Sequence, residues 1–338
     1  MEEMLDHIKE LKLTVINELK ETRDVVSKMK EKIDTMKMEK EGIEAMGYKV
    51  HFVIGDGRTA LVSEVTTADN TTYAMKVMEM KECRLTPSMA REVSILFDIN
   101  HENIVRLEEV VSCGNSLYLI MEHAGEDLNA FLMIKGVQNS EITKRWLKEL
   151  LSAVDFLHKR GLIHRDLKPE NIMIGFDQKL RIADFGSAVR CSDDTNVSSV
   201  LTTLPFRAPE ILLGYHSYGK EIDVWAVGCN FAEMLGSDCL FGDPNTVSVF
   251  DVLTKIFSKI GTPSQQSWLC SLPNFPKDWN QYPEASQIVP DLDALGNDLL
   301  KKMLVIDPFE RITAEGALNH PYLKEQNQIP VPPGDGGL

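Results

Sequence analysis

The residues with the clearest capacity for chemistry lie in two short segments. The first reads His-Arg-Asp-Leu-Lys-Pro-Glu-Asn over residues 164–171, and the second reads Asp-Phe-Gly over residues 184–186. Asp166 can accept or orient the proton of an attacking hydroxyl, and Lys168 can neutralise charge on a transferring phosphoryl group. Asn171 and Asp184 suit magnesium, because an amide beside a carboxylate lets two cations bind without excess negative charge. Together these residues indicate metal-assisted phosphoryl transfer.

Two weaker signals upstream suit the phosphates of a nucleotide. Gly55-Asp56-Gly57 marks a strand-to-strand turn, where glycines let backbone N–H groups approach phosphate oxygens, although an ordinary hairpin explains such a pair more often. Lys76 lies among apolar residues of a strand, and a buried ammonium needs an anion. Glu92 on the following helix is a natural partner, and the pair would hold the α- and β-phosphates. The alternative is a solvent-facing lysine and a solvated glutamate.

Apolar periodicity predicts the elements that position these groups. Alternating residues predict an antiparallel sheet of five strands, at residues 51–54, 61–67, 73–78, 105–111 and 117–121. One main helix follows Thr86, and helical periodicity then continues from Asp127 to about Leu323. The predicted fold class is therefore α+β, with a small sheet lobe over 48–121, a hinge over 122–126 and a mainly helical lobe over 127–323.

The two ends of the chain have a different character. Residues 1–41 are rich in Glu, Lys, Leu and Met and contain neither Gly nor Pro, and the first glycines follow at Gly42 and Gly47. This pattern predicts a long helix over 1–46. A seven-residue frame places mainly apolar residues at its a and d positions, so we expect a coiled coil with a partner or a second copy. A helix that docks on the folded domain is the alternative. Residues 324–338 are rich in Pro and Gly and predict a disordered tail.

Composition limits the class of protein. The chain has 338 residues, of which 43% are apolar and 26% charged, which is enough for a two-lobed unit with an appendage. A net charge of −15 argues against nucleic acid or an anionic membrane as the main binding surface. The six cysteines show no paired spacing, so we expect reduced thiols. Without an apolar leader or spanning segment, we expect an intracellular protein.

Residues 48 to about 323 resemble a eukaryotic protein kinase domain, and most closely the cyclin-dependent kinases. Besides the segments above, the resemblance rests on the amino-acid sequences of residues 207–214, 228–234 and 261–263. It implies ATP and Mg²⁺ as cofactors, with Asn171 and Asp184 as metal ligands. It also implies a nucleotide site whose gatekeeper is Met121, formed by Ile54, Gly55, Asp56, Gly57, Val62, Ala74, Lys76, Glu92, Met121, Glu122, Ala124 and Asp127.

The same resemblance implies substrates and regulation. Lys168 and Thr203 are typical of Ser/Thr rather than Tyr phosphorylation, and Arg207 of a preference for proline after the target residue. Residues 86–92 stand where the family carries its cyclin-contacting helix signature, which implies a cyclin-like activator. Ser198, or alternatively Ser199, aligns with the activating threonine, and Arg91 and Arg165 would bind its phosphate. Three structural roles are also implied: His164 as a packing residue, Asp223 as a helix anchor for the loop over 164–171, and Glu210 with Arg311 as a buried ion pair that fixes the end of the activation segment.

Several positions depart from the family pattern. Arg58 and Thr59 replace the usual Thr-Tyr pair, so inhibitory tyrosine phosphorylation cannot occur there, and Ala60 replaces the third glycine. The family has a third arginine that binds the same phosphate. In this chain Val189 occupies its position, and the arginine is displaced to the next residue, Arg190. Pro205 and Phe206 replace a Trp-Tyr pair, which weakens the expectation of proline preference.

Three functions compete on this sequence. The leading one is an active, partner-dependent protein kinase with a cell-cycle or transcriptional role, located in the nucleus, the cytoplasm or both. The second is a weakly active kinase-fold scaffold that recruits partners through its N-terminal helix. The third is a kinase of small molecules, which the resemblance of residues 207–214 to a protein-substrate groove disfavours.

Overall fold

The computed structural model describes residues 42–56, 60–191, 203–236, 239–242, 248–275 and 280–324. They form two compact units: unit 1 contains the described residues up to Leu85 together with Leu107–His123, and unit 2 contains Thr86–Arg106 and those from Ala124 onward. Several predictions lie outside the described residues, namely the helix over 1–41, Gly57, Ser198, Ser199 and the C-terminal tail. Within the part of the chain that the structure describes, no helix is long and apolar enough to cross a membrane.

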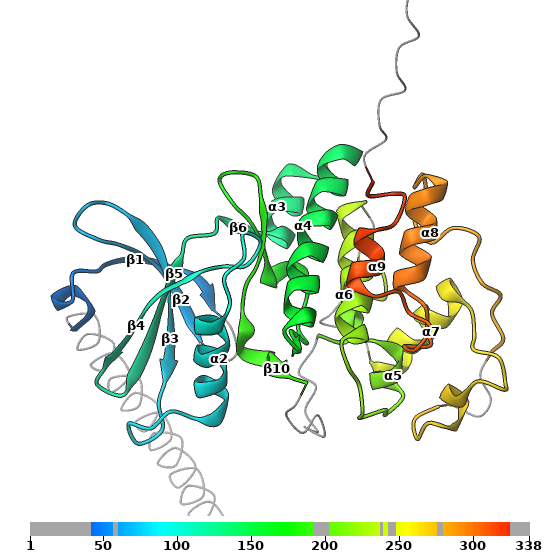
Figure 1. Ribbon diagram of the computed structural model, residues 1–338, viewed down its shortest axis with the longest axis horizontal. Helices are drawn as coiled ribbons and strands as arrows, with labels where there is room; N and C mark the ends of the chain where they lie inside the picture. The colour runs from blue at the N-terminus through cyan, green and yellow to red at the C-terminus, as the bar shows by residue number, and fades with distance from the viewer. Residues whose placement is uncertain are drawn as a thin grey trace, which may run out of the picture. The chain divides into compact units, whose positions relative to one another are not determined.

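Unit 1 is a five-stranded sheet whose paired strands are all antiparallel (Figure 1). In chain order the strands are β1 (Lys49–Asp56), β2 (Leu61–Thr66), β3 (Thr72–Glu79), β4 (Leu107–Cys113) and β5 (Ser116–Glu122), arranged as β1-β2-β3-β5-β4. The predicted sheet is therefore confirmed. The fourth strand begins at Leu107, later than expected. Val105 belongs to unit 2, where its N–H donates to the Ile182 carbonyl instead of joining the sheet.

One face of this sheet carries the core of unit 1. Val65, Met75, Tyr118 and Ile120 alternate with residues of the opposite face, as strand geometry requires, and they pack around Ile43. Ile43 is 1% exposed and comes from the short helical turn that precedes β1. The chain entering the sheet is thus fixed to it by a buried aliphatic side chain.

Helix α2 (Pro87–Asp98) begins at Thr86, whose hydroxyl accepts a hydrogen bond from the Met89 N–H at 3.3 Å. The sequence groups this helix with the sheet lobe, but its contacts assign it to unit 2. It packs against the short helix η2 (Phe185–Ser187), which the Asp-Phe-Gly segment forms.

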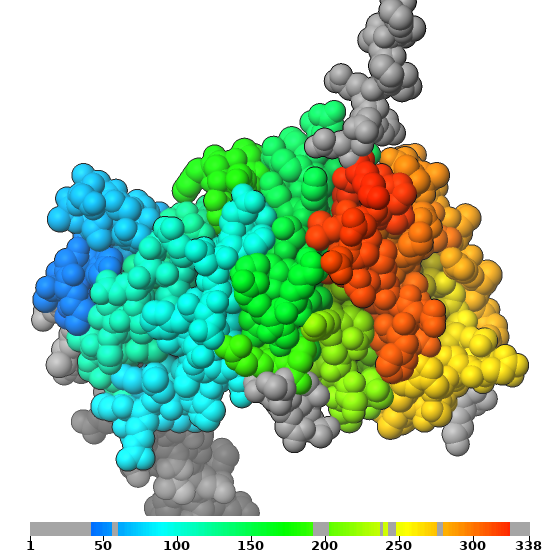
Figure 2. Space-filling view, in the orientation of Figure 1, coloured from blue at the N-terminus to red at the C-terminus, as the bar shows by residue number. Residues whose placement is uncertain are grey.

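The rest of unit 2 is mainly helical, as predicted. Its α-helices are α3 (Leu128–Lys135), α4 (Ser140–Lys159), α5 (Pro209–Leu212), α6 (Glu221–Met234), α7 (Val249–Ile260), α8 (Ala294–Met303) and α9 (Ala314–Leu318). Helix α6 is buried along almost its whole length and packs against α4 and α8 (Figure 1). Helix α9 lies against α4, where Figure 2 shows its red surface beside the green of that helix. An all-round buried helix is a rigid support for neighbouring loops.

Candidate active site

The predicted catalytic segment is a loop between two short structural elements of unit 2. It follows β7 (Leu162–Ile163) and ends in the 3-10 helix η1 (Pro169–Asn171), after which β8 (Ile172–Ile174) pairs with β9 (Leu180–Ile182). The Ala183 N–H donates to the Asn171 carbonyl at 2.9 Å. This hydrogen bond extends the strand pair, so Asn171 and Asp184 lie at the same end of it although they are separated in sequence.

Four predicted site residues are joined by polar contacts. Asn171 Nδ2 donates to the Asp166 carbonyl at 2.8 Å and to the Asp166 carboxylate at 3.1 Å. Lys168 Nζ lies 3.5 Å from the same carboxylate and donates to the Thr203 hydroxyl at 3.3 Å. The fold thus brings the proposed base, the proposed phosphate-neutralising lysine and one proposed metal ligand together with Thr203.

Asp223 of α6 holds the start of this loop. Its carboxylate accepts the backbone N–H groups of His164 and Arg165, each at 2.9 Å, and it lies 2.9 Å from His158 Nε2. Burial would raise the pKa of Asp223, but the hydrogen bond and charge of His158, the charge of His164 and its backbone hydrogen bond hold it below the usual value. The expected anchor role of Asp223 is confirmed.

His164 is a packing residue, as expected. Its ring is fully buried and lies edge-on to Phe185 with 4.9 Å between ring centroids. Nδ1 lies 3.3 Å from the Asp166 N–H and Nε2 lies 3.1 Å from the Ala183 carbonyl. A proton on Nε2 satisfies both contacts, so the imidazole links the loop to the strand that precedes Asp184.

Asp184 begins the turn that continues into η2. Its backbone is left-handed, with φ of 58°, and its Oδ1 accepts the Gly186 N–H at 3.3 Å. A Cβ atom on Gly186 would lie 3.2 Å from Asp184 Oδ1 and 3.3 Å from Glu92 Oε2. The glycine therefore allows the buried Glu92 carboxylate of α2 to approach this turn closely.

Unit 1 carries most of the predicted nucleotide-binding residues. Strand register places Gly55 opposite Val62 and Val62 opposite Lys76, so these positions share a sheet face. Ala74 pairs with Met121 on the same face, which lies opposite the Ile43 cluster. Ile54, Asp56 and Glu122 belong to the strands β1 and β5 that flank this row.

The other residues predicted for the nucleotide site are Lys76 with its partner Glu92, Ala124 and Asp127. Lys76 and Glu92 are both buried, at 6% and 5% exposure, but they belong to different units, so the ion pair between them stays a prediction. Ala124 is buried, and the second stretch of unit 2 begins with it. Asp127, expected in the nucleotide site, accepts the Ala130 N–H at 2.8 Å and thereby caps α3.

Arg165, one of the two arginines expected to bind a phosphorylated activation site, has protein contacts. Arg165 is buried; its Nε donates to the Ser187 carbonyl at 2.6 Å and its Nη1 to the Tyr218 hydroxyl at 3.0 Å. Arg190, beside the displaced position, pairs with Asp98 of α2. The Tyr218 contact was missed from the sequence, because no local pattern connects a tyrosine with a loop so far upstream.

A buried ion pair links α5 to the segment that follows α8. Arg311 donates through two nitrogens to both carboxylate oxygens of Glu210, at 2.8 and 2.9 Å, and both side chains are fully buried. This bidentate geometry confirms the pair expected from the sequence.

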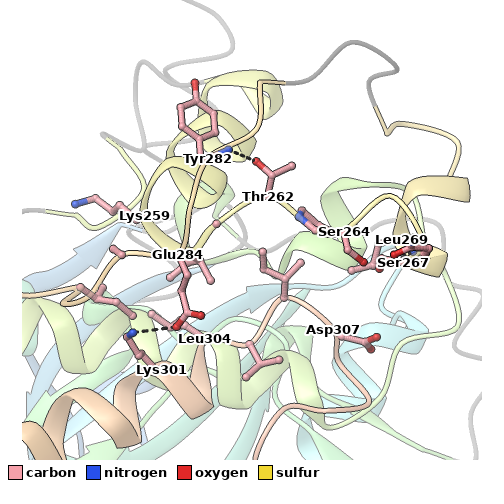
Figure 3. A pocket seen from close by; sticks show the side chains of 18 residues that line it. Lys259, Thr262, Ser264, Ser267, Leu269, Tyr282, Glu284, Lys301, Leu304 and Asp307 are labelled. Atoms are coloured by element: carbon pink, nitrogen blue, oxygen red, sulfur yellow. Dashed lines mark hydrogen bonds and ion pairs between the residues drawn. The ribbon is translucent and has the colours of Figure 1, made fainter.

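A separate cavity of about 540 Å³ lies beyond the end of α7 (Figure 3). The figure shows the Lys301–Glu284 ion pair at 2.9 Å and the Tyr282 N–H donating to Thr262 at 2.9 Å along its wall. None of the predicted site residues lines it.

The parts described above are those of a nucleotide-dependent phosphotransferase: a sheet with a buried lysine on one face, and a loop that groups an aspartate, a lysine and an asparagine. A family model described as protein kinase domain matches residues 48–323. The chain belongs to the protein kinase family, and this membership implies use of ATP.

Proposed function

We propose that this chain is an active serine/threonine protein kinase of the cyclin-dependent type, which phosphorylates serine or threonine followed by proline. The observation that carries the proposal is the polar cluster of Asp166, Lys168, Asn171 and Thr203. Its Asp166 carboxylate is 13% exposed and its Lys168 side chain 22% exposed, so both groups remain accessible to a substrate.

The residues of this cluster have distinct tasks. Asp166 accepts the proton of the substrate hydroxyl, and Asn171 fixes the direction of that carboxylate. Lys168 neutralises charge on the transferring phosphoryl group while Thr203 restrains its ammonium. Burial lowers the pKa of Arg207 and the charge of Asp166 partly opposes this shift, which is consistent with a guanidinium beside the catalytic loop where the substrate segment binds.

The donor set suits Mg²⁺ bound together with ATP. Because Asn171 Nδ2 is used by Asp166, its Oδ1 is the atom that would bind a cation, and the Asp184 side chain is exposed at the same end of the strand pair. Among the described residues there is no cluster of three or more His, Cys, Asp or Glu that could hold a metal. Mg²⁺ typically takes one or two protein oxygens and completes its coordination with phosphates and water, and it would supply charge neutralisation there.

Control of the kinase is proposed to involve protein partners. Phe97, next to the last residue of α2, is 68% exposed, which supports a cyclin-like activator on this helix. Phosphorylation of Ser198 and a coiled coil over residues 1–41 complete the proposal. The role in the cell cycle or transcription, and the location in nucleus or cytoplasm, follow from the family resemblance.

The test is phosphate incorporation by the full chain captured from cells with its partners. The substrates are matched peptides carrying Ser-Pro, Ser-Ala or Tyr-Pro, and Asp184→Asn is the control variant. We expect incorporation into Ser-Pro, less into Ser-Ala, almost none into Tyr-Pro, and a large loss in the variant. Equal incorporation by wild type and Asp184→Asn would contradict the proposal and favour the scaffold alternative. That alternative predicts that deletion of residues 1–41 removes partner capture.

A further inference from the structure

Helix α6 offers two polar side chains to the catalytic loop. Asp223 and Asn230 are two helical turns apart, which places them on one face of the helix, and their exposed fractions are 1% and 0%. Asp223 accepts the N–H groups of His164 and Arg165 at the start of the loop. Asn230 Nδ2 lies 3.4 Å from the Leu167 carbonyl, farther along the loop, and 2.7 Å from the Ala226 carbonyl.

The orientation of the Asn230 amide is determined by its neighbours. Both nearby groups are carbonyl oxygens, which only accept hydrogen bonds, so Nδ2 must face them. Oδ1 is then left buried and accepts no hydrogen bond from any residue in the described ranges. A buried acceptor without a donor destabilises the folded state. Stability therefore does not explain an asparagine at this position, which lies between buried neighbours such as Cys229 and Phe231.

We propose that Asn230 is a positioning residue for phosphoryl transfer, acting through the Leu167 carbonyl. This carbonyl belongs to the peptide plane that leads into Lys168, and the preceding carbonyl, of Asp166, is held by Asn171 at 2.8 Å. Two side-chain amides thus hold successive carbonyls between the proposed base and the lysine. The inference rests on the proposed function, since it concerns turnover at that same site.

The experiment compares Asn230→Leu and Asn230→Met with Val227→Ala in the full chain. Both Asn230 variants have aliphatic side chains of comparable length and remove the donor, and methionine adapts to irregular space. Val227 is a fully buried residue of the same helix and serves as the packing control. For each variant, kcat, KM for ATP, KM for a Ser-Pro peptide and Tm are measured.

We expect kcat to fall about 3- to 10-fold in both Asn230 variants, the range that the loss of one hydrogen bond gives, with both KM values within about twofold of wild type. Their Tm should equal or exceed that of wild type, whereas Val227→Ala should lower Tm and leave kcat unchanged. An unchanged kcat in either Asn230 variant overturns the inference, as does a fall in Tm larger than that of Val227→Ala in both. No turnover by wild type above Asp166→Asn overturns the proposed function itself.

Discussion

Residues of the candidate site are held by backbone pairing in unit 1 and by buried side chains in unit 2. In unit 1, the strand register alone aligns Gly55, Val62 and Lys76 on one face. In unit 2, the predicted catalytic loop over residues 164–171 is held by individual buried polar groups, above all the Asp223 carboxylate. Backbone hydrogen bonds between strands persist when one side chain is replaced. A buried hydrogen bond made by a side chain is lost when that side chain is replaced, and its partner is left unsatisfied. Substitutions in unit 2 should therefore change turnover, and those on the face of unit 1 that carries Lys76 should change nucleotide affinity.

The largest expected effect comes from Asp166→Asn in unit 2. Removal of the proton acceptor should lower kcat by about 10²–10⁴-fold with little change in KM for ATP, because an asparagine cannot take up the substrate proton. Steady-state kinetics with the Ser-Pro peptide measures this. Asp155→Asn, which alters an ion pair with Lys159, is the matched control and should keep wild-type kcat. Equal rates for the two variants would contradict the assigned base.

The core of unit 1 provides the next test. Ile43→Ala should reduce the free energy of unfolding of this unit by about 2–5 kcal/mol, because it leaves a cavity under the sheet. Urea denaturation followed by far-UV circular dichroism measures this loss. Met46→Ala, at a position 44% exposed, should change stability little. Similar losses in both variants would show that Ile43 is not the anchor of the entering chain.

Substitution of Asp223 tests the side-chain support of unit 2. Asp223→Asn should lower the unfolding free energy by about 1–3 kcal/mol near neutral pH, since one carboxylate oxygen becomes a donor that faces backbone N–H groups. Because the folded-state pKa of Asp223 is lowered, its contribution to stability is complete above the unfolded value of about 3.9 and is lost as the pH falls through the folded value.

The difference in stability between wild type and Asp223→Asn should therefore be smaller at about pH 3 than at about pH 7. Denaturant titrations at the two pH values measure it. A difference that grows on acidification would mean that the folded state does not favour the ionised carboxylate.

The smallest effect is expected from Val62→Ala on the face of the unit 1 sheet that carries Lys76. Loss of two methyl groups beside a bound nucleotide should raise KM for ATP by less than about tenfold, with kcat nearly unchanged. Val65→Ala, on the opposite face and fully buried, should lower Tm but leave KM for ATP unchanged. If Val62→Ala lowered kcat as strongly as a change in the catalytic loop, the contrast between the two units would fail.

Local patterns were sufficient for the elements and for many single residues. The period of two predicted the strands, and the motif over 164–171 predicted Asp166, Lys168 and Asn171, which the fold groups together. Residue types with strong local preferences also marked the start of α2 at Thr86. These features depend on neighbours in sequence, and sequence therefore reveals them.

The sequence by itself determined which chemical groups this protein possesses and which segments become strands or helices, because periodicity and local chemistry are written in neighbouring residues. The tertiary structure alone decided the Tyr218 contact with Arg165, the assignment of α2 to unit 2 and the hydrogen bond from Asn230 to Leu167. Each depends on segments distant in sequence being packed together, and the direction of a buried side chain follows from that packing. These contacts therefore became visible only in the folded chain.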